Sequence, residues 1–233
     1  MIQIGPAPAP GRLPIPSESR MMRAMTAILG LSLGLMELGA CKIVPNPEPG
    51  SESAASQTDD DRMAAKAGEI YAAQLVPYVA QKAIELPTLT GALQGGFDAA
   101  GQAHGVRPQA EGSPWNFLLK GQGTVIEANR ESRAATMALD TTGDNQADVT
   151  IQLGPVIKGT ALRDAADFIV FTDYRDQIEF AKLARALNDR AHGAVKLPEG
   201  DLTGKTFRFE GAATLRTATD PILVVPTLLE AAP

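Results

Sequence analysis

The sequence predicts an α+β fold in which N-terminal helices precede a mostly antiparallel sheet or small β-barrel with one long inserted amphipathic helix. Apolar residues recur at helical spacing over residues 62–103. Residues 114–233 instead contain several short segments in which apolar and polar residues alternate. A run of helices followed by a run of strands is typical of α+β proteins. We therefore expect a single domain over residues 62–233.

The helical part starts after Asp59-Asp60-Asp61, whose negative charge suits the N-terminus of a helix. One apolar stripe follows, made by Ala65, Ile70, Ala73 and Val76. Pro77 should kink or interrupt this helix, because proline lacks the N–H that an interior position donates. A further helix is expected over residues 89–103, and a loop over residues 104–113.

The β-rich part is predicted from alternation and from turn residues. The expected strands are residues 117–119, 123–126, 135–139, 149–153, 206–210 and 222–225. The first two should flank a turn at Gly121-Gln122-Gly123. The third and fourth form the clearest pair, since Val149, Ile151 and Leu153 would share one face. The polar linker 140–148 would close this hairpin.

The inserted helix is expected over residues 173–191. Its apolar stripe, at spacings of three and four, consists of Tyr174, Ile178, Ala181, Ala184, Leu187 and Ala191. The charged residues between them, including Glu179, should face water. Thr160 is a suitable N-cap for a short helix over residues 161–166. The apolar segment 168–171 is expected to form a short strand or to continue that short helix.

The only cysteine, Cys41, follows a segment with the pattern of an export signal. Arg20 and Arg23 precede an apolar run that ends in Leu38-Gly39-Ala40-Cys41, as in bacterial lipoprotein signals, where the cysteine sulfur is acylated. We expect a leader and signal peptide over residues 1–40, lipidation at Cys41 and a disordered tether over residues 41–61. The protein would then lie in the cell envelope, on the periplasmic side. Lys42 favours the outer over the inner membrane.

An uncleaved membrane anchor and a buried core helix are the alternatives to this signal. The apolar run over residues 24–36 rises only about 20 Å as a helix, which is too short to span a bilayer. Gly30 and Gly34 weaken it as a core helix. Whether translation begins at Met1 or at Met21 or Met22 stays open.

Charge and residue counts exclude several classes of function. The formal net charge is −6, with no basic stripe, so nucleic acid is not an expected partner. The two histidines, His104 and His192, have no serine or carboxylate at a recognisable spacing. Acylation of Cys41 would remove the only thiol from catalysis and from metal binding. No cofactor is predicted.

Three aspartates in the hairpin linker, Asp140, Asp144 and Asp148, resemble an oxygen-rich calcium loop. However, Asn145 occupies the position of the expected turn glycine, and Ile151 the position of the bidentate glutamate. A plain hairpin turn is therefore favoured, with a calcium site as the alternative.

The densest polar cluster comprises Thr160, Arg163, Asp164, Asp173, Arg175 and Gln177. Arg163 and Asp164 flank a segment that should be buried, where a charge needs a partner. A structural salt-bridge network is the first interpretation. The second is a site for an anionic or polyol ligand.

Several strings resemble a family of predicted bacterial periplasmic lipoproteins, catalogued as domain of unknown function 2291. They are Trp115-Asn-Phe, Lys120-Gly-Gln-Gly-Thr-Val, Ser132-Arg133 and, above all, Ile151-Gln-Leu-Gly-Pro-Val-Ile-Lys-Gly-Thr-Ala-Leu-Arg-Asp164. The resemblance implies an envelope lipoprotein, often encoded near sugar ABC-transporter components. It implies no established activity and no catalytic residues.

Three functions follow as hypotheses. The first is a non-enzymatic lipoprotein that assists sugar uptake by contacting a transporter or a solute-binding protein. The second is an envelope hydrolase that uses a carboxylate pair such as Asp164 and Asp173, because glycoside hydrolysis needs two facing carboxyl groups. The third is a purely structural envelope component.

Overall fold

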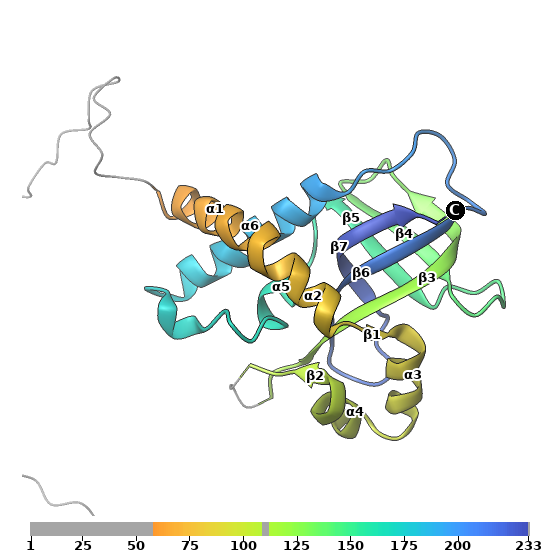
Figure 1. Cartoon of the computed structure of the whole chain (residues 1–233), viewed down its shortest axis with the longest axis horizontal. Coiled ribbons are helices and arrows are strands. Elements are labelled where there is room, and N and C mark those ends of the chain that lie inside the picture. Colours follow the sequence, from red (N-terminus) through yellow and green to blue (C-terminus); the bar gives the residue numbers. More distant parts are fainter. Residues whose placement is uncertain (1–57, 109–111, 233) are drawn as a thin grey trace, which may run out of the picture. The chain divides into compact units, whose positions relative to one another are not determined.

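A closed barrel of five strands, with helices packed against its outer face, forms the described part of the chain (Figure 1). The computed structural model describes residues 58–108 and 112–232. The signal peptide, Cys41 and the tether up to residue 57 lie outside the described residues. The α+β prediction, with a small barrel after N-terminal helices, is confirmed.

The barrel strands follow one another in the order β3-β4-β5-β7-β6, and β6 returns to β3 to close the barrel. They are β3 (Trp115–Asn129), β4 (Ala134–Asp140), β5 (Val149–Pro155), β6 (Thr206–Leu215) and β7 (Leu223–Ala231). All neighbours are antiparallel except β5 and β7, which are parallel. The predicted hairpin is present as β4 and β5, with Leu139 opposite Val149.

The prediction of a turn at Gly121–Gly123 is wrong, because β3 runs without a break through these residues. Its first part pairs with β6 and its second part with β4, so that Thr124 has a partner on both sides. The glycines allow close approach instead. A Cβ at Gly123 would lie 2.6 Å from the carbonyl oxygen of Asp140, and one at Gly121 would lie 3.0 Å from the Phe209 ring.

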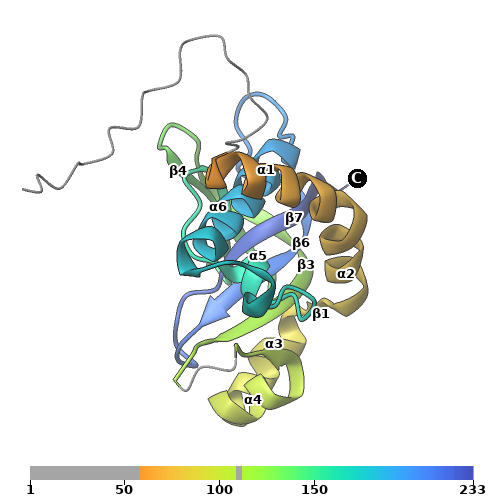
Figure 2. The ribbon, with the colours of Figure 1, turned by 90° about the vertical axis from the view of Figure 1, so that its left-hand side faces the viewer.

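Alternate residues of the strands fill the barrel with a core built mainly from aliphatic side chains and phenylalanines. Its largest fully buried members include Phe117, Leu119, Met137, Leu139, Ile151, Phe207 and Phe209. Leu86 and Leu89 of α3 (Leu86–Gln94) join the same core from one end of the barrel. Figure 2 shows α3 and α4 (Phe97–His104) at that end, away from α1 and α6.

The first helix, α1 (Asp59–Ile70), begins three residues before the predicted domain start. Thr58 explains this start, because it forms a capping box with Asp61: its side chain accepts the Asp61 N–H and its own N–H bonds the Asp61 carboxylate. The chain continues as a π-helical turn, η1 (Tyr71–Leu75), and then as α2 (Val76–Lys82). The wider turn lies just before Pro77, where a regular α-helix would need the missing N–H.

The single helix predicted over residues 89–103 is instead the pair α3 and α4, separated at Gly95-Gly96, where Gly96 has φ 127°. Two short strands, β1 (Ile84–Glu85) and β2 (Gly105–Val106), flank this pair and join β3. Residues 105–106 were expected to lie in a loop.

The connection from β5 to β6 carries α5 (Ala161–Asp164), a 3₁₀ turn η2 (Phe171–Asp173) and α6 (Gln177–Ala194). Segment 168–171 is therefore neither a strand nor a continuation of the short helix. The long helix starts four residues later than predicted, because the Asp176 side chain caps it by accepting the Glu179 N–H at 2.8 Å.

The predicted apolar stripe of α6 is only partly right. Ile178 and Ala181 are exposed, whereas Glu179, expected to face water, is 7% exposed. The buried face consists of Glu179, Leu183, Ala184, Leu187, Asn188 and Ala191. It packs with α1 and α2 onto Leu118, Ala212 and Val225 of the barrel exterior, which forms a second core.

Candidate functional site

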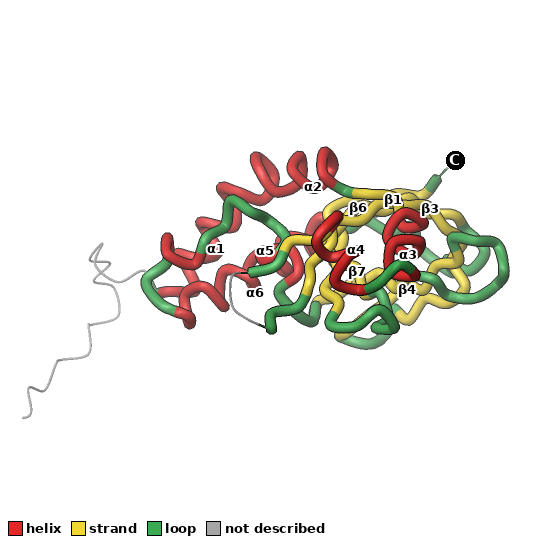
Figure 3. Tube along the Cα trace, turned by 90° about the horizontal axis from the view of Figure 1, so that it is seen from below, coloured by secondary structure: helices red, strands yellow, loops and turns green. Residues whose placement is uncertain are grey.

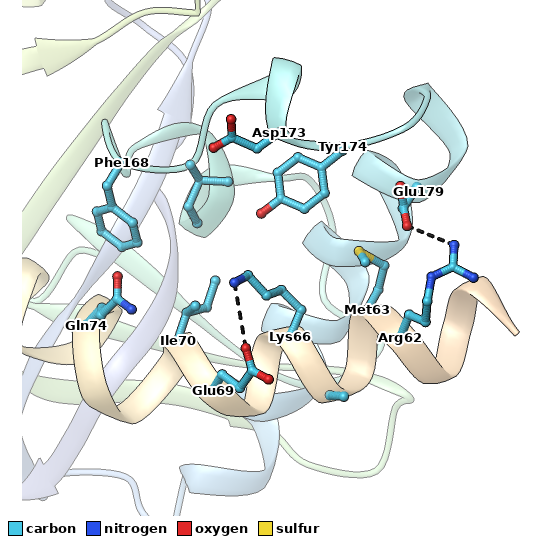
Figure 4. A pocket seen from close by; sticks show the side chains of 12 residues that line it. Arg62, Met63, Lys66, Glu69, Ile70, Gln74, Phe168, Asp173, Tyr174 and Glu179 are labelled. Carbon is cyan, nitrogen blue, oxygen red and sulfur yellow. Dashed lines mark hydrogen bonds and ion pairs between the residues drawn. The ribbon is translucent and has the colours of Figure 1, made fainter. Parts of the chain in front are cut away.

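A cavity lies between α1 and the segment that leads from α5 into α6 (Figure 4). Its volume is about 470 Å³. We call it the α1–α6 cavity. Its lining residues are Arg62, Met63, Ala65, Lys66, Glu69, Ile70, Gln74, Phe168, Ile169, Asp173, Tyr174 and Glu179.

The floor of the α1–α6 cavity is apolar. Met63 and Ile70 are buried on α1, and Ile169 is buried on the opposite wall. Phe168 is held against Tyr78 in an edge-to-face contact with ring centroids 5.3 Å apart. The floor is therefore part of the second core and has a fixed shape.

One end of the cavity is closed by an ionic network between α1 and α6. Arg62 donates to Glu179 at 2.9 Å and to Asp59 at 2.7 Å. The backbone N–H of Arg175 donates to the other Glu179 oxygen at 2.7 Å. This backbone bond, followed by Arg62, holds the pKa of Glu179 below its ordinary value. Arg175 also binds Asp59 at 2.8 Å, which joins the starts of the two helices.

The remaining polar groups border the open part of the cavity. Figure 4 shows the Lys66 ammonium and the Tyr174 hydroxyl pointing into the space between the two walls, with Gln74 opposite Phe168. Lys66 lies 3.6 Å from the Glu69 carboxylate on the same helix. Burial raises the pKa of Tyr174, so its hydroxyl stays protonated and can donate. The cavity thus offers donors and acceptors above an apolar floor.

The predicted polar cluster is divided by the structure. Thr160, Arg163 and Asp164 form one group at α5, where Arg163 and Thr160 both bind the Asp164 carboxylate. The Arg163 guanidinium lies 3.9 Å from the Phe180 ring centroid. The group is a mostly buried salt bridge.

The other three members are exposed, two of them just before α6 and one at its first residue. Arg175 joins the ionic network, Asp173 lines the cavity, and Gln177 is the first residue of α6. Asp164 and Asp173 therefore have different surroundings: the first is bound to Arg163 and Thr160, and the second lies in an exposed turn.

Sequence reasoning missed most of the cavity. Lys66 and Gln74 on α1 and η1, and Phe168 and Tyr174 some 100 residues later, carry no shared local pattern. The one hint in the sequence that the two walls meet was their opposite charge. The acidic start of α1 and the basic Arg175 before α6 are joined by an ion pair in the structure.

The candidate calcium loop is organised by its own backbone. Asp140 accepts the N–H groups of Thr142, Gly143 and Asn145 at 2.6–2.9 Å, and these bonds, most of all the one from Gly143, lower the pKa of Asp140. Asp148 accepts from Thr141 and Thr142, and Asp144 from the Gln146 N–H. Within residues 58–108 and 112–232, no group of three or more His, Cys, Asp or Glu side chains is placed to hold a metal ion. The structure thus gives these carboxylates the role of turn acceptors.

Comparison with known proteins places the chain in a family. Residues 32–230 match the family model described as predicted periplasmic lipoprotein, domain of unknown function 2291. The chain belongs to this family. The resemblance found in the sequence is thereby confirmed. Membership makes the protein a lipid-anchored periplasmic lipoprotein of unknown biochemical activity. No curated protein matches the chain.

A solved structure with a similar fold is that of an OB-fold protein (TM0957) from Thermotoga maritima MSB8. The similarity has a TM-score of 0.60 at 16% identity and covers 73% of this chain and 98% of that chain. At this identity the similarity shows the fold alone. The lipoprotein is therefore an OB-fold barrel with added helices. In the described ranges, no helix has the length and apolar content that crossing a membrane requires.

The face with which OB-folds commonly bind oligonucleotides or oligosaccharides lies on the second and third barrel strands. In this lipoprotein these are β4 and β5, whose outward residues include Thr136, Ala138, Thr150 and Gln152. The Gln152 side-chain amide donates to the Lys158 carbonyl oxygen, and its oxygen accepts from the Lys158 N–H. Bases are held on such faces by aromatic stacking, which these four residues do not offer.

Two further residues noted in the sequence serve packing. His192 lies against Gly154 and makes a 2.7 Å contact from Nδ1 to the Leu153 carbonyl oxygen. Trp115 packs against the barrel core and bonds Asp98 through Nε1 at 3.2 Å, and Gly101 allows its ring to approach α4.

Proposed function

We propose that this lipoprotein is a non-enzymatic accessory protein that binds a small polyhydroxylated solute, such as a sugar, in the α1–α6 cavity. In this proposal it serves uptake of that solute by an ABC transporter, and acyl chains on Cys41 hold it at the outer membrane. The transporter link rests on the gene neighbourhood that the family resemblance implies.

The α1–α6 cavity carries the proposal. Sugars have hydroxyl groups that donate and accept hydrogen bonds, and C–H faces that pack against apolar surfaces. Gln74, Tyr174 and Lys66 supply donors and an amide acceptor, and Phe168 and Ile70 supply apolar surface. A volume of about 470 Å³ falls in the range of small-molecule sites.

The charges of the cavity favour a neutral ligand over an ionic one. Arg62 and Lys66 carry positive charge, and Glu69, Asp173 and Glu179 carry negative charge. Arg62 and Glu179 bind each other, and Lys66 lies near Glu69, so no single sign dominates the lining. A sugar can bond both kinds of group without bringing a net charge into the cavity.

Hydrolysis is not part of the proposal. A glycosidase needs two carboxyl groups on either side of one bond. Asp164 gives one oxygen to Arg163 and the other to Thr160, which leaves it poorly placed to act on a substrate.

Thermal unfolding of the full-length lipoprotein with a panel of mono- and disaccharides tests the binding role. A ligand at 100 times its Kd raises the free energy of unfolding by about 2.7 kcal/mol. Tyr174→Phe and Gln74→Ala should weaken the effect. Gln146→Ala, in the exposed β4–β5 loop, is the matched control and should not. If no sugar shifts the transition, or if all three variants respond like the parent, the cavity is not a sugar site.

Two separate measurements test the anchor and the partner. Mass spectrometry of the N-terminal peptide should find acyl chains on Cys41, and an unmodified thiol in membrane-derived protein contradicts the anchor. Chemical crosslinking in envelope membranes should recover a transporter or a solute-binding component. Recovery of neither favours a structural envelope role.

A further inference from the structure

Three of the four most exposed large apolar side chains in the described residues come from one short segment. Val170, Phe171 and Ile178 are 47%, 44% and 64% exposed. We call these three residues the apolar tip. The fourth, Val156, is 44% exposed and directly follows β5, outside this segment. Clustered apolar side chains of this kind mark contact surfaces more often than scattered ones do.

The apolar tip is held in place by its own backbone. The N–H of Asp173 donates to the Val170 carbonyl and that of Tyr174 to the Phe171 carbonyl, both at 3.1 Å. The Phe171 and Phe180 rings make an edge-to-face contact with their centroids 5.4 Å apart. The exposed side chains are therefore presented by an ordered turn and by the first turn of α6.

The start of α1 lies beside the apolar tip. Arg175, between Phe171 and Ile178 in the chain, binds Asp59 at 2.8 Å, and Lys182 binds Asp60 at 2.7 Å. Figures 1 and 3 show the starts of α1 and α6 together, at the end of the helical layer away from the barrel. The chain that leads back to Cys41 thus leaves the described domain at this end.

We propose that the apolar tip contacts the phospholipid bilayer that anchors the lipoprotein. The 16 residues between Cys41 and Thr58 span at most about 55 Å, so the start of α1, and the apolar tip beside it, stay within about that distance of the acylated Cys41 in the lipid surface. Asp173, Arg175 and Asp176 around the tip have mixed signs, so contact rests on apolar insertion and not on attraction to anionic headgroups. The proposal rests on the lipid anchor but not on sugar binding.

Fluorescent labels at the tip test this contact. Phe171→Cys and Ile178→Cys are each made in the full acylated chain and labelled with a polarity-sensitive dye, with Val156→Cys as the matched control. Acylation blocks Cys41, which is the only natural cysteine, so each label reports one position. The proteins are reconstituted in phosphatidylethanolamine–phosphatidylglycerol vesicles that contain nitroxide-labelled lipid.

We expect blue-shifted emission and nitroxide quenching at positions 171 and 178, with neither at 156. Both signals should persist at about 1 M salt, where the Debye length falls to about 3 Å. Three results overturn the proposal: labels at the tip that stay as exposed as the control, shielding that depends on protein concentration without lipid, and shielding that requires an added envelope protein. The second result indicates a contact between copies and the third a protein partner. Sugar-induced stabilisation of the same variants reports the function of the cavity independently.

Discussion

Glu179 shows at the scale of one residue how the helical layer depends on ionisation. Its carboxylate accepts from the Arg175 N–H and from Arg62, and these bonds hold its pKa below the ordinary 4.5. Below about pH 4.5 the unfolded chain therefore binds more protons at this residue than the folded protein does. The stabilisation is complete above that pH and is lost as pH falls through the folded pKa.

Glu179→Gln should accordingly lower the free energy of unfolding near pH 7 and have a smaller effect at about pH 3. Urea unfolding at the two pH values measures the difference. Glu69→Gln is the control, because Glu69 is exposed and its contact with Lys66 is long, at 3.6 Å. The charge of Glu69 should therefore contribute little to stability. An effect of Glu179→Gln that is the same at both pH values would show that the charge of this carboxylate does not matter.

Tyr71 presents the opposite case, a buried polar group without a partner. In the described structure its hydroxyl makes no hydrogen bond, and burial raises its pKa to about 12. Removing an unsatisfied buried hydroxyl recovers its desolvation cost, so Tyr71→Phe should stabilise the protein by about 1 kcal/mol. Tyr78→Phe is the matched comparison and should destabilise it slightly, because the Tyr78 hydroxyl bonds Asp167. Chemical denaturation of both variants measures the change in the free energy of unfolding. A clear loss of stability in Tyr71→Phe would contradict the prediction and indicate that a bound water satisfies the hydroxyl.

At the same scale, the sequence misassigned Ile178 and Glu179 because helical periodicity ranks side chains by polarity alone. Arg62, 117 residues away, makes burial of Glu179 favourable by pairing with it. Such a partner is invisible to a local pattern. The α1–α6 cavity was missed for the same reason, since its two walls meet only in the folded chain.

At the scale of the element, glycine marks close approach as often as it marks a turn. Gly211 lies at a bulge where β6 pairs with β7, and a Cβ there would be 2.2 Å from the Val225 carbonyl oxygen. Gly211→Ala should therefore separate these strands and lower stability by about 1–3 kcal/mol. Gly91→Ala is the matched control, because no atom lies within 4 Å of its added Cβ, and it should stabilise α3 by about 0.5–1 kcal/mol. Thermal unfolding monitored by circular dichroism compares the two, and equal effects would refute the steric argument.

The type of most elements could be predicted from the sequence, and their lengths could not. Alternation located β4 and β5 almost completely and the first parts of β6 and β7, because one face of each strand fills the barrel. The sequence divided β3 into two strands at Gly121 and Gly123, because glycine usually indicates a turn. Only the neighbouring Phe209 and Asp140, seen in the structure, explain why glycine is present. The single helix expected over residues 89–103 failed at Gly95-Gly96 for a reason the sequence did contain, since a positive φ at Gly96 suits glycine alone.

At the scale of the whole molecule, two cores share the wall of the barrel. Leu119 points into the barrel, whereas its neighbour Leu118 points outward into the helical layer, together with Ala212 and Val225. The helices of that layer cover an outer face that would otherwise expose apolar surface. The tip and the cavity both lie in this layer, so their geometry depends on how firmly it is attached to the barrel.

This arrangement predicts cooperative unfolding of barrel and helices. Leu118→Ala and Leu119→Ala, one residue apart on β3, should each lower the free energy of unfolding by about 2–5 kcal/mol, since both side chains are at most 5% exposed. In both variants the helical circular dichroism signal and the fluorescence of Trp115, which packs against the barrel core, should change in one shared transition. If Leu118→Ala instead lets the helical signal fall first while Trp115 stays native, the helical layer is a separate unit, and ligand binding in its cavity could be lost without unfolding the barrel.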